Sequence, residues 1–84
     1  MKHFASPEFW ARFAKLPAAV QDLSRENYEL LKANPYHPSL HFKRIGHFWS
    51  VWVGRSYRAL TVDAEDGIVW FWIGTHSEYD HLVG

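Results

Sequence analysis

The spacing of the apolar residues changes once along this chain, near Pro38, and this change decides the fold class. Before residue 35 the apolar side chains recur every three or four positions, which is the repeat of an amphipathic helix. After residue 38 they recur every second position, which is the repeat of a β-strand. We therefore expect an α+β fold, with an antiparallel sheet and an N-terminal helical hairpin on one of its faces.

The hairpin consists of two helices that are separated by Pro17. The first begins at Ser6 and Pro7, because serine caps a helix N-terminus and proline is tolerated in the first turn. Pro17 ends this helix and opens the second, which closes before Pro35 since the residue before proline avoids the α conformation. The apolar positions are Phe9, Phe13 and Leu16 in the first helix and Val20, Leu23, Leu30 and Leu31 in the second, with Tyr28 at the flank.

The strands follow from alternating side chains between turn residues. A short first strand is expected at residues 2–5, and later strands at residues 48–53, 57–62 and 68–73. Leu40, Phe42 and Ile45 also alternate, and a turn at Gly46 and His47 separates them from the strand at residues 48–53. The remaining turns lie at residues 54–56 and 63–67. The expected order is β-α-α-β-β-β.

The last strand is apolar on both faces, which is unusual for an antiparallel sheet with one wet side. Ile68, Trp70 and Trp72 are expected on one face, and Val69, Phe71 and Ile73 on the other. Two helices cover only one face. The other face is covered either by the chain from Gly74 onward or by a partner, which is a protein, a second copy or a nucleic acid stacked on tryptophan.

The composition indicates one small soluble domain over residues 1–84. A chain of this length buries a marginal core, but five Trp, four Tyr and six Phe enlarge it. The absence of cysteine excludes disulfides and cysteine–metal sites. His37 and His41 do not share a helix face because Pro38 separates them, so we expect no metal or other cofactor. No segment has the apolar length of a signal peptide or membrane span, which favours the cytoplasm.

The charges are unevenly distributed although the net charge is zero. Residues 30–62 contain five cations and no acid, whereas residues 63–84 contain five acids and no Lys or Arg. A cationic middle segment is what a polyanion site needs. The alternative is that these cations are simply solvated.

Arg58 interrupts an otherwise apolar strand and is the strongest candidate for holding a phosphate group, because its guanidinium pairs with phosphate oxygens. The alternative is an ion pair with Asp63 or Glu65. His76 follows the last strand, and an imidazole that titrates near neutrality suits acid or base catalysis, unless its role is structural. Tyr79 either stacks on a base or orients a phosphate, or it belongs to the core.

Lys43, Arg44 and Arg55 are the candidates for contacts with an RNA backbone. Lys43 and Arg44 are adjacent in the predicted strand, so their side chains face opposite ways and at most one of them reaches the site. Arg55 lies in a turn, where it contacts RNA generally or is solvated.

Three stretches of the sequence, taken in order, resemble the motifs of one known family. Residues 16–40, with Leu16-Pro17, Asn34-Pro35 and His37-Pro38-Ser39-Leu40, are similar to the helical hairpin and following loop of that family. Residues 48–60 read FWSVWVGRSYRAL, which resembles the strand pair YSVRVGxxYRAL. Residues 73–80 read IGTHSEYD, which resembles the ending IGTHxxYD of a RelE-like subgroup. The ordered set covers nearly the whole chain and identifies it as similar to toxins of the RelE/ParE superfamily.

This resemblance implies a toxin of a bacterial toxin–antitoxin system: a ribosome-dependent mRNA endonuclease that a cognate antitoxin neutralises. It places the strand arginine of the family at Arg58, a functional histidine at His76 and a basic position at Lys43. Trp52 stands where the pattern usually carries a basic residue, and the chain is neutral where ribosome-dependent toxins are basic. Both departures favour two alternatives, a ParE-like inhibitor of DNA gyrase and a catalytically inactive, solitary binding or regulatory protein.

Overall fold

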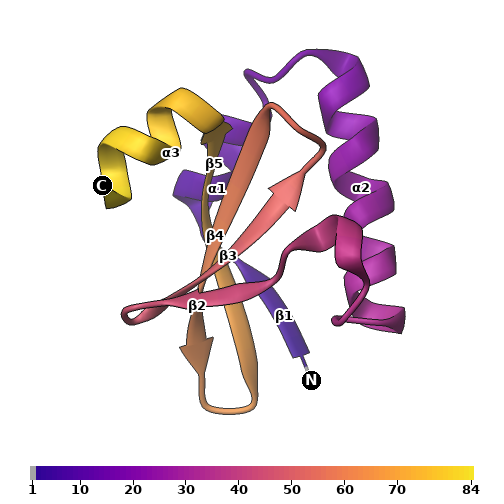
Figure 1. Ribbon diagram of the computed structural model, residues 1–84, viewed down its shortest axis with the longest axis vertical. Coiled ribbons are helices and arrows are strands. Elements are labelled where there is room, and N and C mark those ends of the chain that lie inside the picture. The colour runs from indigo at the N-terminus through magenta and orange to yellow at the C-terminus, as the bar shows by residue number, and fades with distance from the viewer. Residues whose placement is uncertain (1) are drawn as a thin grey trace.

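The computed structural model describes residues 2–84, which form a twisted five-stranded sheet with helices on both sides (Figure 1). In chain order the elements are β1 (Lys2–Ala5), α1 (Pro7–Phe13), α2 (Ala18–Ala33), the short 3₁₀ helix η1 (Pro38–Leu40), β2 (Lys43–Ile45), β3 (Phe48–Val53), β4 (Tyr57–Ala64), β5 (Gly67–Thr75) and α3 (His76–Val83). The expected α+β class and the two N-terminal helices are confirmed.

The strand order in the sheet is β1-β5-β4-β3-β2. All neighbours are antiparallel except β1, which pairs with β5 in parallel, with His3 beside Ile68 and Ala5 beside Trp70. The expected antiparallel sheet therefore includes one parallel pair, at this edge. The two strands lie so close together that a Cβ at Gly67 would overlap the backbone carbonyl of Lys2.

One face of the sheet, called the core face here, packs against α1 and α2. Ser6 caps α1 as expected, since its Oγ accepts the backbone N–H of Phe9 at 3.2 Å. The buried hydrophobic cluster on this side consists of Phe9, Phe13, Leu31, Leu40, Val51, Val53, Ala59, Ile68, Trp70 and Ile73. It draws on both helices and the three longest strands, so it ties the two halves of the sequence together.

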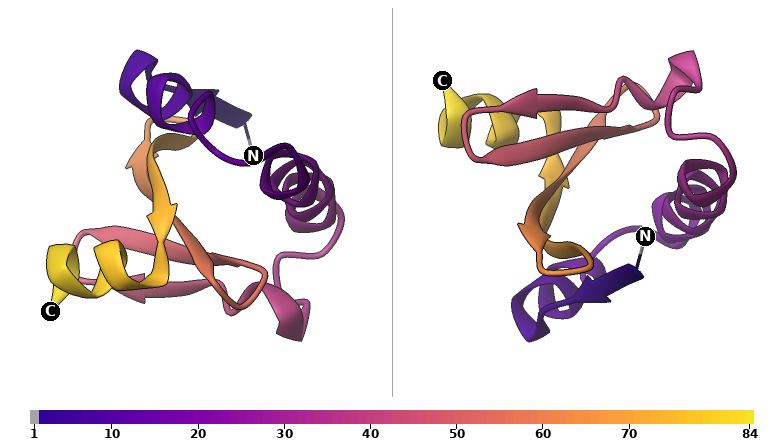
Figure 2. Two further views of the ribbon diagram at one scale, coloured as in Figure 1. Left: turned by 90° about the horizontal axis from the view of Figure 1, so that it is seen from above. Right: turned by 90° about the horizontal axis from the view of Figure 1, so that it is seen from below.

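The opposite face, called the second face here, is partly covered by α3, which the sequence analysis treated as an irregular tail. Figure 2 shows α3 and α2 on opposite sides of the sheet. Thr75 and Glu78 form a capping box that starts α3, and Tyr79 is buried against the sheet at 8% exposure. The chain thus covers part of its own second face, while Phe4 and Phe48 remain exposed.

A register shift between β4 and β5, at Leu60 and Thr61, breaks the alternation that the sequence predicted for the last strand. Ile73 consequently joins Ile68 and Trp70 in the core, and Trp72 pairs with Leu60 on the second face. The expected sides of Trp72 and Ile73 were therefore wrong, because a bulge inserts one residue and reverses every side chain beyond it. Residues 40–42 are likewise not a strand, since η1 occupies the segment that begins at Pro38.

Candidate functional site

Arg58 lies on the second face of β4, paired across the sheet with Trp52 of β3. Its residue exposure is 3%. Nη1 donates to backbone carbonyl oxygens at the β3–β4 turn, those of Gly54 at 3.5 Å, Arg55 at 3.1 Å and Tyr57, the first residue of β4, at 2.8 Å. The turn therefore holds this side chain in one orientation, and the expected alternative of an ion pair with Asp63 or Glu65 is not formed.

His76 is the first residue of α3, and the helix start places its ring beside Arg58. Its backbone N–H donates to the carbonyl of Ser56 at 2.7 Å, and its Nδ1 lies 3.3 Å from Nη2 of Arg58. A guanidinium has no acceptor, so Nδ1 accepts and the neutral ring carries its proton on Nε2. That atom lies 3.1 Å from Oδ2 of Asp80, one helical turn further on.

The two contacts of His76 differ in how readily they open. The Asp80 pair is exposed, with side-chain exposures of 51% and 62%, and an exposed ion pair contributes little to stability. Arg58, in contrast, is fixed by its hydrogen bonds to backbone carbonyls at the β3–β4 turn. Nε2 is therefore the atom of this ring that an incoming ligand can take over from Asp80.

Trp52 and His41 complete the cluster, although the sequence analysis assigned neither to the site. The guanidinium carbon of Arg58 lies 4.0 Å from the Trp52 ring centroid, and the His41 ring stacks on Trp52 at 3.7 Å. His41 has a φ of 44°, in the left-handed region that costs energy for a residue with a side chain. The position of Trp52 opposite Arg58 in the predicted strand pair could have assigned it to the site. No feature of the sequence indicated His41.

Burial lowers the pKa of Arg58 from its ordinary value, while Tyr79 and Asp80 act in the opposite direction. The ordinary value lies far above neutrality, so the group stays cationic. A buried positive charge beside an exposed imidazole favours an anion at that imidazole. The ring of His76 is the exposed member of this pair, and the arginine is the buried one.

Tyr79 lies on the inner side of α3, with its residue exposure at 8%. It contributes to the charge environment of Arg58 and to the packing of α3 against the sheet. The stacking role expected as one alternative needs a ring that a base can reach. The buried position supports the core role for this tyrosine.

The three cations expected to bind RNA are separated by the fold. Lys43 is paired with Ser50 and faces the second face, the side of Trp52 and Arg58, where it is exposed. Arg44 faces the other way, and its Nη1 donates to Oδ2 of Asp63 at 2.7 Å. Arg55 is exposed in the β3–β4 turn, and its backbone carbonyl oxygen accepts a hydrogen bond from Arg58.

Within residues 2–84 the structure contains no cluster of three metal-binding side chains. None of the helices in that range is long and apolar enough to cross a membrane.

The comparison with family models matches residues 18–81 to the ParE-like toxin domain. No curated protein matches the chain. This range includes α2, most of the sheet and α3 down to residue 81, and so contains every residue of the candidate site.

Three solved structures share the fold. A chain of the RelB-RelE antitoxin-toxin complex from Methanococcus jannaschii superposes with a TM-score of 0.72 at 18% identity, over 93% of this chain and 96% of that one. The YoeB/ParE toxin from Agrobacterium tumefaciens gives 0.70 at 12% identity, over 90% and 99%. A copper-bound mutant toxin from Helicobacter pylori gives 0.66 at 17% identity, over 93% and 97%. At such identities the likeness shows the fold.

Proposed function

The chain belongs to the ParE-like toxin domain family of the RelE/ParE superfamily, and from this premise we propose that it is the toxin of a toxin–antitoxin pair and cleaves messenger RNA on the ribosome. The observation that carries the proposal is the exposed ring of His76, held at Nδ1 by the buried cation of Arg58. Both residues lie on the side of the sheet that also presents Lys43.

Metal-free RNA cleavage needs a base for the 2′-hydroxyl proton, an acid for the leaving oxygen and positive charge near the phosphate. The 2′-oxygen attacks phosphorus, and the bond from phosphorus to the 5′-oxygen breaks. One proton leaves the 2′-hydroxyl and one reaches the 5′-oxygen. His76 takes the 2′-hydroxyl proton at Nε2, which requires the tautomer that carries its proton on Nδ1. RNA displaces Asp80 from Nε2, and the hydrogen bond from Arg58 to Nδ1 opens as the ring changes tautomer. The imidazolium then gives its Nε2 proton to the 5′-oxygen, and Arg58 offsets the charge of the phosphorane.

The geometry refines the role of Arg58. Three of its hydrogen bonds go to the turn and one to His76, so it acts through the imidazole and by its charge rather than as an exposed clamp. Lys43 is the exposed cation that contacts the RNA backbone on this side. Arg55, also exposed, adds a contact near the turn. Tyr79 supports the site by holding α3 against the sheet.

The partner that restrains this activity is a protein antitoxin. The RelB-RelE complex shows a toxin of this fold together with its antitoxin. Phe48, exposed at 38%, and Phe71 pack together on the second face with ring centroids 5.3 Å apart, and this apolar surface suits a partner segment. Messenger RNA on ribosomes is the substrate, which places the protein in the cytoplasm.

The second candidate function is inhibition of a protein target such as DNA gyrase, without chemistry. Two observations favour it: Arg58 is buried, and Trp52 with His41 stacked on it replaces a basic residue of the family pattern. Induced expression followed by RNA mapping separates the candidates. Growth arrest with new 5′ ends in messages supports cleavage, arrest without them supports inhibition, and normal growth supports a binding or regulatory role.

A further inference from the structure

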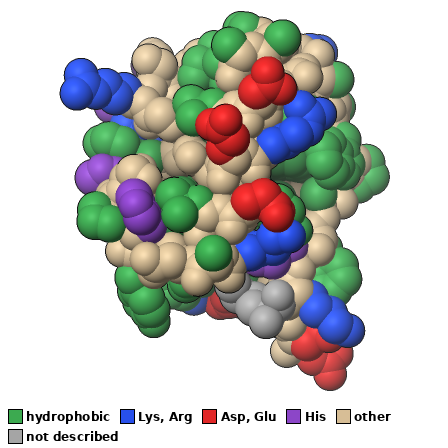
Figure 3. All heavy atoms as spheres, turned by 90° about the vertical axis from the view of Figure 1, so that its right-hand side faces the viewer, with side chains coloured by type: hydrophobic (Ala, Val, Ile, Leu, Met, Phe, Trp, Pro, Cys, Tyr) green, Lys and Arg blue, Asp and Glu red, His purple; other side chains and the backbone are tan. Residues whose placement is uncertain are grey.

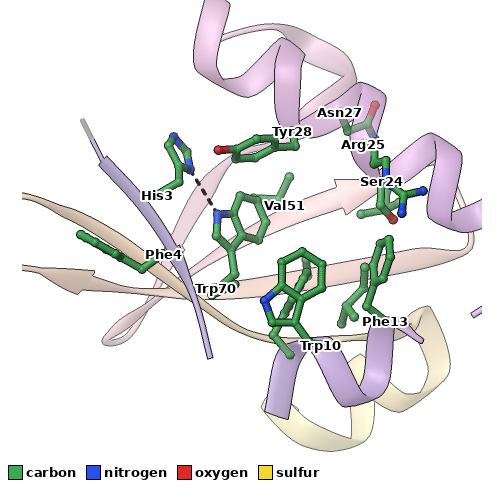
Figure 4. A pocket seen from close by; sticks show the side chains of 15 residues that line it. His3, Phe4, Trp10, Phe13, Ser24, Arg25, Asn27, Tyr28, Val51 and Trp70 are labelled. Carbon is green, nitrogen blue, oxygen red and sulfur yellow. Dashed lines mark hydrogen bonds between the residues drawn. The ribbon is translucent and has the colours of Figure 1, made fainter. Parts of the chain in front are cut away.

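A cavity of about 290 Å³ opens between α1, α2 and the core face of the sheet (Figure 4). Its floor consists of sheet side chains, Val51, Val53, Ala59, Trp70 and Ile73. Its walls are Phe9, Trp10 and Phe13 of α1 and the α2 residues from Ser24 to Tyr28 that face the sheet. The floor is the reverse side of the strands that carry Trp52 and Arg58, so the cavity is separate from the candidate site.

The cavity exists because the two helices pack on different strands. α1 lies against β5, whereas α2 lies against β3. The short link between them is fixed by Gln21, whose Nε2 donates to the carbonyl oxygens of Phe13 and Leu16. The helices are thereby held apart at a set spacing, and the space between them is not closed by side chains.

Most of the cavity lining is apolar. The hydroxyl of Ser24 and one N–H of Asn27 donate to backbone carbonyls, to Val20 at 2.7 Å and Trp52 at 3.2 Å. Nδ1 of His3 accepts the indole N–H of Trp70 at 3.1 Å. The Tyr28 hydroxyl and the Arg25 guanidinium lie beside an apolar floor, so the cavity favours an occupant that is mostly apolar with one polar end.

Charge selects among apolar occupants. Arg25 is the formally charged side chain among the described residues that line the cavity, and none of these residues is acidic. Its carboxylate neighbour, Asp22, is 3.6 Å away and largely exposed. The guanidinium carbon lies 5.1 Å from the ring centroid of Phe13, at the aromatic wall. On the outer side of α2, in contrast, acidic and basic side chains lie next to one another (Figure 3), as in the pair of Lys32 and Glu29 at 2.8 Å.

We propose that this cavity binds a small aromatic monoanion, with its rings between Phe9, Phe13 and Trp70 and its carboxylate on Arg25. The volume suits a molecule of roughly ten to fifteen heavy atoms, at the small end of protein ligand sites. Three aromatic walls offer tilted and edge contacts to a flat ligand. The proposal does not depend on RNA cleavage.

The test uses 1-naphthoate and its neutral counterpart, naphthalene-1-methanol, with the full chain. In ¹H–¹⁵N spectra, naphthoate is expected to shift the indole N–H signals of Trp10 and Trp70, which line the cavity, and to leave that of Trp72 in place. Calorimetry gives the affinities. Naphthoate is expected to bind about two- to fivefold more tightly than the alcohol, the range of one exposed ion pair.

Two variants separate the apolar and charged parts. Arg25→Gln is expected to reduce naphthoate affinity to that of the alcohol, whereas Lys15→Gln, which removes an exposed cation outside the cavity, leaves it unchanged. Ser24→Leu fills the cavity, and we expect it to raise Tm and abolish binding of both probes. Should it fold poorly, the Arg25→Gln comparison still decides.

The proposal is overturned if neither probe moves the Trp10 and Trp70 signals at millimolar concentration. It is also overturned if the alcohol binds wild type as tightly as naphthoate does, because the charge then selects nothing. Sedimentation showing a dimer that covers Trp10 would instead assign the cavity to a second copy of the chain.

Discussion

Nη2 of Arg58 lies 3.3 Å from Nδ1 of His76, although eighteen positions separate the two residues and they belong to a strand and a helix. The sequence indicated each of them separately, one as a phosphate ligand and the other as an acid or base. The structure joins them into one unit because α3 starts at His76 and its first backbone N–H is anchored on Ser56. The exposed ring and the buried cation therefore lie in direct contact.

Replacing Arg58 with lysine tests whether the planar guanidinium matters in addition to its positive charge. A single ammonium is not expected to satisfy three turn carbonyls and Nδ1 at once, so the His76 ring loses its anchor. We expect Arg58→Lys to reduce single-turnover cleavage about 10²- to 10³-fold. The ¹⁵N shifts of His76 should also show loss of the fixed Nε2–H tautomer, which a merely structural arginine would not affect.

The control for this variant is Arg55→Lys in the same turn. The Arg55 side chain is exposed, and only its carbonyl contacts Arg58. We expect normal cleavage and an unchanged His76 tautomer. Equal losses in both variants would show that the turn, rather than the guanidinium, matters.

The opposite orientations of Lys43 and Arg44 predict different effects on RNA binding. Lys43→Gln is expected to weaken binding of single-stranded RNA and to make the log–log salt slope shallower by about 0.7, the contribution of one phosphate contact. Arg44→Gln is expected to leave the slope unchanged, because Arg44 faces the other side and pairs with Asp63. Fluorescence anisotropy titrations at salt concentrations from about 50 to 200 mM measure the slopes of both variants. A larger effect at Arg44 would contradict the assignment.

The period of the apolar residues was sufficient to predict the two N-terminal helices, the three long strands and the opposite orientations of Lys43 and Arg44. It failed where a single inserted residue mattered: the bulge at Leu60 moved Ile73 into the core, which no periodicity of β5 itself reveals. It also missed α3, although Thr75 and Glu78 stand at the spacing of a capping box. The signal was present, but it was interpreted as the end of a strand.

The site was predictable in its chemistry and not in its geometry. Arg58 and His76 stood out as a charge in an apolar strand and an imidazole at a strand end. The stacking of His41 on Trp52 depends on a left-handed backbone at residue 41, which local sequence does not specify for a histidine. The burial of Arg58 depends on α3, which was missing from the predicted fold.

Two threonines with opposite roles give a stability prediction. Thr61 is fully buried, and its hydroxyl has no hydrogen-bond partner within residues 2–84, so Thr61→Val should raise the free energy of unfolding by about 1 kcal/mol. Thr75 Oγ1 accepts the N–H of Glu78 at 3.1 Å, so Thr75→Val should lower it by about 1 kcal/mol. Urea unfolding of both variants measures the two signs. A loss at Thr61 would show that its hydroxyl is satisfied in solution.

The hydrogen bond from Trp70 to His3 predicts a loss of stability in acid. Burial, followed by the nearby Lys32, lowers the pKa of His3 from its ordinary value of 6.5. The unfolded chain then binds the proton more readily, so the contribution of neutral His3 is complete above 6.5 and is lost as pH falls through the lowered folded value. His3→Asn retains an acceptor for Trp70 without titrating.

The measurement is the free energy of unfolding in urea as a function of pH. As the pH falls below 6.5, the free energy of unfolding of wild type should decrease relative to that of His3→Asn. His47→Asn removes a histidine from an exposed turn and should keep the wild-type dependence. Parallel curves for wild type and His3→Asn would mean that His3 does not titrate in this way.

The central claim is that the His76 ring performs the chemistry, and single-turnover cleavage of a ribosome-bound message tests it most directly. We expect His76→Gln to fold normally and to cleave about 10²- to 10⁴-fold more slowly than wild type. His81→Gln, on the same helix and exposed, should cleave as wild type does. Cleavage by His76→Gln at the rate of the His81→Gln control would contradict the account.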